Sequence, residues 1–205
     1  MAKARHWRDL HIASRHYGNQ RTAHKARLPA DRPYPRQQRH SAVYHQFARA
    51  VKQARHYVYI TSEFFVPNPD FLQLLQEAHH RGVDVRVLVP EHSDIWPMDW
   101  VFVTYTPRYL KSGLRIFHYR KSALHGKTAL VDDRWATVGH ISFDAMLHGR
   151  EASIITTDPH EVLQLKQQFL TDLKGSRELT WAQWRRVPLW KKIAGYGIRG
   201  LRAIV

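Results

Sequence analysis

The chain has 205 residues and no cysteine, which excludes disulfides, thiolate metal sites and a cysteine nucleophile. A hydrophobic content of 43% with seven tryptophans predicts a packed core, and no apolar run approaches the roughly 18 residues that a bilayer-spanning helix needs. The net charge of +15 is concentrated at the two ends, because residues 1–40 hold ten Lys or Arg against two Asp and residues 174–205 hold eight against one Glu.

Residues 1–40 contain several prolines and little periodicity, which predicts a basic, loosely ordered lead-in. Helices and strands are then expected to alternate through residues 41–173, where apolar residues recur at helical spacing between short β-rich runs. The expected order is helix 42–54, strand 57–61, helix 71–78, strand 83–89, helix 98–111, strand 114–117, strands 127–131, 135–138 and 152–156, and helix 159–173. This alternation predicts an α/β domain with a mixed β-sheet flanked by helices.

The last stretch, residues 174–205, is basic and rich in tryptophan. Its indoles and cations are interleaved in the order Trp181, Trp184, Arg185, Arg186, Trp190, Lys191 and Lys192. Tryptophan prefers the headgroup level of a bilayer and neighbouring cations attract anionic lipid, so these residues predict a membrane-interfacial tail. The alternative is a terminal helix whose tryptophans pack on the preceding domain. Pro188 and several glycines argue against one long helix.

One motif carries chemistry. From His125 the chain has the form H-x-K-x4-D-x6-G, with Lys127, Asp132 and Gly139 at the other fixed positions. Residues two apart on a strand point to the same face, so the His125 imidazole and the Lys127 ammonium are expected to converge. An imidazole can attack phosphorus and hold the group covalently, while a lysine neutralises charge on the phosphoryl oxygens. Asp132 lies an odd number of positions from Lys127, so it is expected to face away in a structural or orienting role.

This motif resembles the HKD motif of the phospholipase D superfamily, and it is similar to the second such motif of bacterial cardiolipin synthases. The resemblance also includes the runs 57–67, 81–85 and 113–117, and it covers residues 42–190. It implies a single HKD domain of phospholipase D-like fold that needs neither a cofactor nor a metal.

The same resemblance assigns roles to individual residues. His125 would be the nucleophile or the acid/base histidine, Lys127 would bind phosphate, and Asp132 completes the catalytic motif. Glu151 stands where the family has a carboxylate that orients a histidine. The family's Ser-x-Asn after the motif is replaced here, which leaves His140 and Ser142 as the expected substrate-binding positions.

Phospholipase D-type sites normally combine two H-x-K motifs, and this chain has one. Three explanations stay open: a homodimer, a separately encoded first-half subunit, or a truncated and inactive product. The resemblance implies phosphatidyl transfer through a phosphohistidine, as in cardiolipin synthesis. A homodimeric single-motif phosphodiesterase or nuclease, or an inactive membrane-binding remnant, are the alternatives.

Charge distribution favours lipid over nucleic acid as the partner. Residues 41–173 hold fourteen basic and fourteen acidic residues, whereas a nuclease is expected to carry basic charge on its catalytic domain. The neutral domain and the tail therefore predict an anionic phospholipid membrane as the partner. The N-terminus lacks the apolar stretch of a secretory signal, which predicts a peripheral protein on the cytoplasmic face of the inner membrane.

Overall fold

The computed structural model describes residues 42–93, 96–121, 124–139 and 153–202. The predicted lead-in, residues 1–40, lies outside these described residues. Residues Arg39–Val205 belong to one compact unit.

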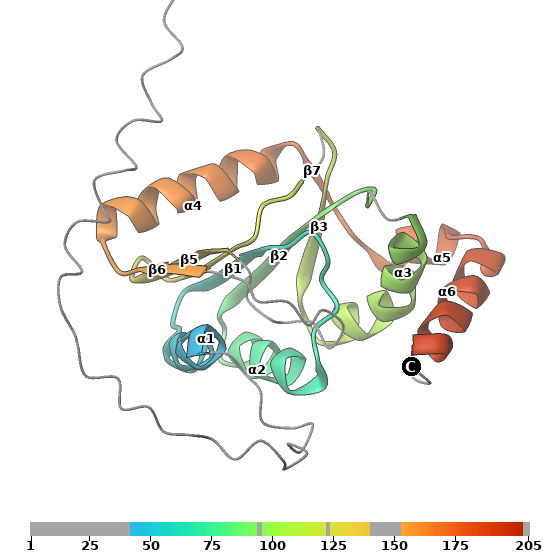
Figure 1. The fold of residues 1–205 in the computed structure, drawn as a ribbon, viewed down its shortest axis with the longest axis horizontal. Helices are drawn as coiled ribbons and strands as arrows, with labels where there is room; N and C mark the ends of the chain where they lie inside the picture. The colour runs from blue at the N-terminus through green and yellow to red at the C-terminus, as the bar shows by residue number, and fades with distance from the viewer. Residues whose placement is uncertain (1–41, 94–95, 122–123, 140–152, 203–205) are drawn as a thin grey trace, which may run out of the picture. The chain divides into compact units, whose positions relative to one another are not determined.

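A seven-stranded mixed sheet forms the centre of this unit, in the order β6-β5-β4-β1-β2-β3-β7 (Figure 1). The strands are β1 Tyr57–Thr61, β2 Asp84–Pro90, β3 Arg115–Tyr119, β4 Thr128–Val131, β5 Trp135–Gly139, β6 Ser153–Thr156 and β7 Ser176–Glu178. Strands β1, β2 and β3 run parallel, and the remaining neighbours pair antiparallel. The parallel centre places the carboxyl ends of β1, β2 and β3 at the same edge of the sheet.

Helices cover both faces of the sheet. They are α1 Ala42–Gln53, α2 Pro69–His80, α3 Trp96–Lys111, α4 Pro159–Lys174, α5 Trp181–Arg186 and α6 Leu189–Arg202. Side chains alternate along β1, so Val58 and Ile60 pack in the core formed with α1 and α2, while Tyr59 stacks on Phe169 of α4. Figure 1 shows α1 and α2 on one side of the sheet and α4 on the other.

Local sequence signals explain where the helices begin. The Asn68 side chain accepts the Phe71 N–H and Pro69 follows it at the first position of α2. Asp158 and Pro159 begin α4 in the same way. Strand β1 spans the predicted residues, and the other predicted elements shift by one or two residues at their ends. The short strand β7 was not predicted, because three residues are too few to show the alternation of apolar and polar side chains that marks a strand.

The tail forms two helices, α5 and α6, on either side of Val187 and Pro188. Both pack on α3, and the contact has a local cause. Pro107 lies inside α3 and has no N–H for the carbonyl of Val103 four residues earlier. The Trp184 indole donates to that carbonyl oxygen at 3.0 Å. The tail therefore satisfies a backbone acceptor that the helix leaves open.

Several apolar side chains of α6 stay largely exposed, including Trp190, whose ring also meets Trp100 of α3. Leu189, Trp190, Ile193 and Tyr196 are 54–70% exposed and lie along one side of α6. None of the helices within the described ranges combines the length and the apolar character needed to cross a membrane.

Candidate active site

The H-x-K motif lies where β4 begins, beside the end of β1. Strands β1 and β4 pair antiparallel with Thr61 opposite Thr128, so residues just before β4 lie next to residues just after β1. Strand β4 starts one residue after Lys127 rather than at it. Gly126 allows the two segments to approach, since a Cβ there would lie 3.2 Å from the Thr61 Cγ2 atom.

His125 and Lys127 both contact the carboxylate of Glu63, two residues beyond β1. The His125 Nδ1 atom lies 3.3 Å from Glu63 Oε1, and the Lys127 Nζ atom lies 3.9 Å from Glu63 Oε2. The Glu63 side chain is 15% exposed, against 34% for Lys127 and 61% for His125. A largely buried carboxylate thus lies behind an accessible imidazole and a partly accessible ammonium.

This arrangement has a chemical consequence. A carboxylate at Nδ1 orients the imidazole and leaves Nε2 as the atom that attacks phosphorus or transfers a proton. The neighbouring ammonium supplies the positive charge that a phosphoryl group needs.

Sequence reasoning missed Glu63. Glu63 lies two residues after a buried strand, and loops at the carboxyl edge of a sheet commonly carry functional residues. That signal was present in the printed sequence, but only the β1–β4 pairing connects Glu63 with the motif.

Asp132 lies at the opposite end of β1 from Glu63. It sits in the turn between β4 and β5 with φ of 47°, and its carboxylate accepts the backbone N–H groups of Arg55, His56 and Tyr57 at 2.9–3.0 Å. Burial would raise the pKa of the Asp132 carboxyl, but these three donors outweigh it and hold the pKa below its usual range. The Asp132 carboxylate thus anchors its turn to the start of β1, away from Glu63, and its catalytic role stays a prediction.

Three further predicted site residues, Glu151, His140 and Ser142, lie outside the described residues. The predicted membrane-binding residues are all described. Trp184 is bound to α3 and has the Lys192 ammonium 4.0 Å from its ring centre, whereas Arg185 and Arg186 are exposed. Trp190 is 56% exposed and meets Trp100 of α3 edge-on at 5.4 Å. The tail thus combines packing on the domain with an exposed apolar side.

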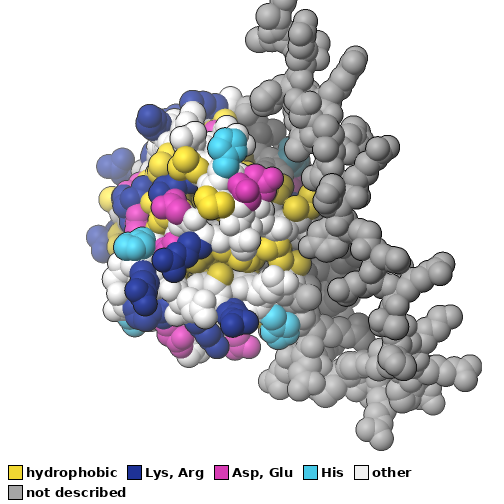
Figure 2. Space-filling view, turned by 90° about the vertical axis from the view of Figure 1, so that its left-hand side faces the viewer, with side chains coloured by type: hydrophobic (Ala, Val, Ile, Leu, Met, Phe, Trp, Pro, Cys, Tyr) yellow, Lys and Arg dark blue, Asp and Glu magenta, His cyan; other side chains and the backbone are white. Residues whose placement is uncertain are grey.

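Surface charge on the domain is mixed. Figure 2 shows the side of the domain that carries β6, where Lys and Arg side chains are interspersed with Asp and Glu among the coloured residues. On that face, the described residues form no continuous basic band of the kind that a polyanion would follow.

Solved structures share this fold. A phospholipase D family member, Nuc from Salmonella typhimurium, aligns with a TM-score of 0.54 and 19% identity over 65% of this chain and 88% of its own. Phosphatidylserine synthase from Haemophilus influenzae aligns with a TM-score of 0.64 and 12% identity over 79% of this chain and 42% of its own. These likenesses confirm the predicted phospholipase D-like α/β fold.

Sequence relatives are more specific. Cardiolipin synthase of Staphylococcus aureus is 32% identical over 148 residues, which is 71% of this chain and 30% of that protein. Cardiolipin synthase A of Yersinia pseudotuberculosis is 28% identical over 175 residues, which is 84% of this chain and 35% of that protein. The chain thus spans about a third of the length of these relatives. Residues 47–173 match the family model described as cardiolipin synthase, PLD-like domain, and the chain belongs to that family of phospholipase D-type phosphodiester-transfer proteins.

Proposed function

We propose that the chain transfers a phosphatidyl group between alcohols at a membrane surface, as in cardiolipin synthesis. One observation carries the proposal: within the segment that matches the cardiolipin synthase family, His125 and Lys127 meet on the Glu63 carboxylate.

The proposed chemistry has two displacements at phosphorus. The His125 Nε2 atom attacks, a nitrogen–phosphorus bond forms, and the bond from phosphorus to the leaving alcohol oxygen breaks. Lys127 stabilises the charge on the phosphoryl oxygens, and Glu63 stabilises the positive charge that develops on the imidazole. An acceptor alcohol then gives up its proton and attacks phosphorus, and the nitrogen–phosphorus bond breaks.

This chemistry needs a second acid/base group. The leaving oxygen must gain a proton while His125 is bonded to phosphorus, so His125 cannot serve both tasks in one step. The sequence has one H-x-K motif. We therefore propose that a second histidine comes from a partner, either another copy of this chain or a separate first-half subunit. In a symmetric dimer, the two His125 side chains would face one phosphate across an isologous interface.

A homodimeric phosphodiesterase or nuclease is the second candidate. The single motif favours it, and the interspersed charges of the domain do not. An assay of purified protein on labelled phosphatidylglycerol vesicles and on single-stranded DNA, with molecular mass measured in the same preparation, distinguishes the two. We expect phosphatidyl transfer by a multimer, lost in His125→Ala and reduced at least about a hundredfold in Lys127→Ala. DNA cleavage without lipid turnover, or full activity in His125→Ala protein, would contradict the proposal.

The membrane contact is proposed to lie on α6, on the cytoplasmic face of the inner membrane. The exposed apolar side chains of α6 are flanked by cations, which is the pattern of an interfacial helix. Ile193→Ser combined with Tyr196→Ser should weaken binding to anionic vesicles even at high salt, because their contribution is apolar. The matched change Leu163→Ser, at an exposed position of α4, should leave vesicle binding unchanged. Equal losses in the two proteins would contradict an interfacial α6.

A further inference from the structure

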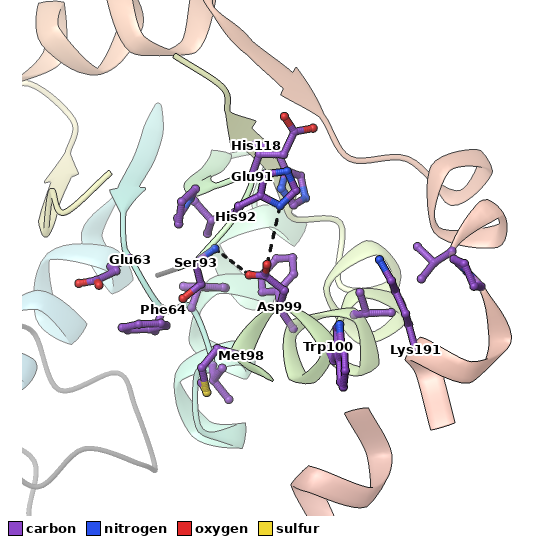
Figure 3. Close-up of a pocket in the computed structure, with 18 residues that line it drawn as sticks. Glu63, Phe64, Glu91, His92, Ser93, Met98, Asp99, Trp100, His118 and Lys191 are labelled. Atoms are coloured by element: carbon purple, nitrogen blue, oxygen red, sulfur yellow. Dashed lines mark hydrogen bonds and ion pairs between the residues drawn. The ribbon is translucent and has the colours of Figure 1, made fainter. Parts of the chain in front are cut away.

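A cavity of about 240 Å³ lies beside the candidate active site (Figure 3). Its walls come from the segment that follows β1, from the end of β2 and the segment that follows it, from His118 of β3, from α3, and from the junction between α5 and α6. The carboxyl edge of parallel strands is a common place for ligands, because the loops there diverge around a crevice.

Most side chains on the cavity wall are apolar. Phe64, Met98, Trp100 and Phe102 are among them, and Val103 extends the apolar wall along α3. Figure 3 shows Phe64 on this wall, next to Glu63.

Among the polar groups of the wall, Asp99 contacts Ser93 and His92, whereas the buried His118 Nδ1 atom has no hydrogen-bond partner among the described residues. The Asp99 carboxylate accepts the Ser93 N–H at 2.8 Å and lies 3.8 Å from His92 Nδ1, as the dashed lines in Figure 3 show. Burial raises the pKa of Asp99 and lowers the pKa of His118, so the surroundings disfavour charge on either group. The Glu63 carboxylate on this wall would also repel a phosphate, whereas the Glu91 carboxylate is paired with Arg120 and Arg177. The cavity therefore suits an uncharged, apolar group.

Two features connect this cavity with the rest of the proposed site. Glu63 forms part of its wall, and the same side chain contacts His125 and Lys127. On the other side, Pro188 and Lys191 form part of the rim at the start of α6, next to the exposed Leu189. A lipid bound with its phosphate at His125 would thus have an apolar cavity on one side and a membrane-facing helix beyond it.

We propose that the cavity holds the first part of an acyl chain of the phospholipid whose phosphate is bound at His125 and Lys127. The inference rests on the proposed lipid function and goes further, since it assigns a separate binding site for the hydrocarbon.

Binding of two soluble probes tests the assignment without any turnover. One probe is dihexanoyl phosphatidylglycerol below its micelle concentration, and the other is the deacylated glycerophosphoglycerol. We expect the unaltered protein to bind the acylated probe at least about tenfold more tightly, because burying a few methylenes contributes that much. Val103→Phe, which fills the cavity, and Phe64→Ser, which makes its wall polar, should each remove most of this difference. Leu163→Phe, on exposed α4, should keep it.

Each outcome of this experiment decides something. Equal binding of both probes by the unaltered protein overturns the cavity assignment and leaves the phosphate site in place. An acyl preference that persists in both cavity variants overturns the assignment as well. Failure of the unaltered protein to bind either probe removes the lipid function and the cavity assignment together. Displacement of the acylated probe by a dinucleotide, sensitive to Val103→Phe, would assign the cavity to a base instead.

Discussion

Replacement of Asp132 by asparagine tests whether this aspartate stabilises the fold or takes part in catalysis. The carboxylate accepts three backbone N–H groups at the start of β1, two on one oxygen and one on the other. Asparagine tolerates the left-handed φ of 47° about as well as aspartate, so the exchange removes charge without adding backbone strain. Its carbonyl oxygen can keep the two shared donors, but its amide group would then face the Arg55 N–H.

The expected magnitude follows from these contacts. One hydrogen bond to a charged acceptor is lost and two are weakened, which together amount to about 3 kcal/mol of unfolding free energy. For a domain of this size that loss lowers the melting temperature by roughly 6–12 °C. The matched control is Asp133→Asn, because Asp133 is 62% exposed, its pairing with Lys166 is worth about 0.5 kcal/mol, and an asparagine oxygen can still accept the Tyr57 hydroxyl.

The pH dependence gives the same prediction an independent check. The pKa of Asp132 is lowered in the folded protein, so its stabilisation is complete above the unfolded value of about 3.9 and is lost as pH falls through the folded value. Urea unfolding should therefore show a difference in unfolding free energy between the unaltered and Asp132→Asn proteins. This difference should be complete at pH 7 and should shrink below about pH 4. The anchoring role would be refuted if this difference in unfolding free energy did not change with pH, or if Asp132→Asn were as stable as Asp133→Asn. Folded Asp132→Asn protein should keep its catalytic activity.

Two shorter predictions concern Glu63 and the tail. Glu63→Ala should remove the acceptor that holds the proton on His125 Nδ1, so ¹⁵N spectra should show a mixture of the two ring tautomers. Any transfer activity should fall about a hundredfold. Glu63→Gln, whose side-chain oxygen can still accept, should keep the Nδ1–H tautomer. An unchanged tautomer in Glu63→Ala would remove the orienting role. Trp184→Phe should lower the unfolding free energy by about 1–3 kcal/mol, because a carbonyl of α3 loses its donor. Adding Pro107→Ala, which restores a helical N–H, should recover most of that loss, and simple additivity of the two changes would contradict the proposed pairing.

Much of the domain was predictable because its signals are local. Strand β1 is a run of β-branched and aromatic residues, and α4 follows Asp158 and Pro159, a cap and a first-turn proline. The H-x-K motif was visible for the same reason, since both side chains lie within three residues. The odd spacing also placed Asp132 away from the phosphate, although the motif pattern alone grouped it with the catalytic residues.

Contacts between distant segments were decided only by the tertiary structure. Glu63 reaches His125 because β1 pairs with β4, and Trp184 reaches α3 because Pro107 leaves a carbonyl open. Composition predicted that the tail is basic and rich in tryptophan, but it did not distinguish an indole that faces the domain from one that faces outward. Sequence therefore determined which residues form helices, strands and the motif, because those depend on neighbours along the chain. Strand pairing and helix packing decided which carboxylate the histidine meets and which side of α6 remains exposed, because both depend on residues far apart in sequence.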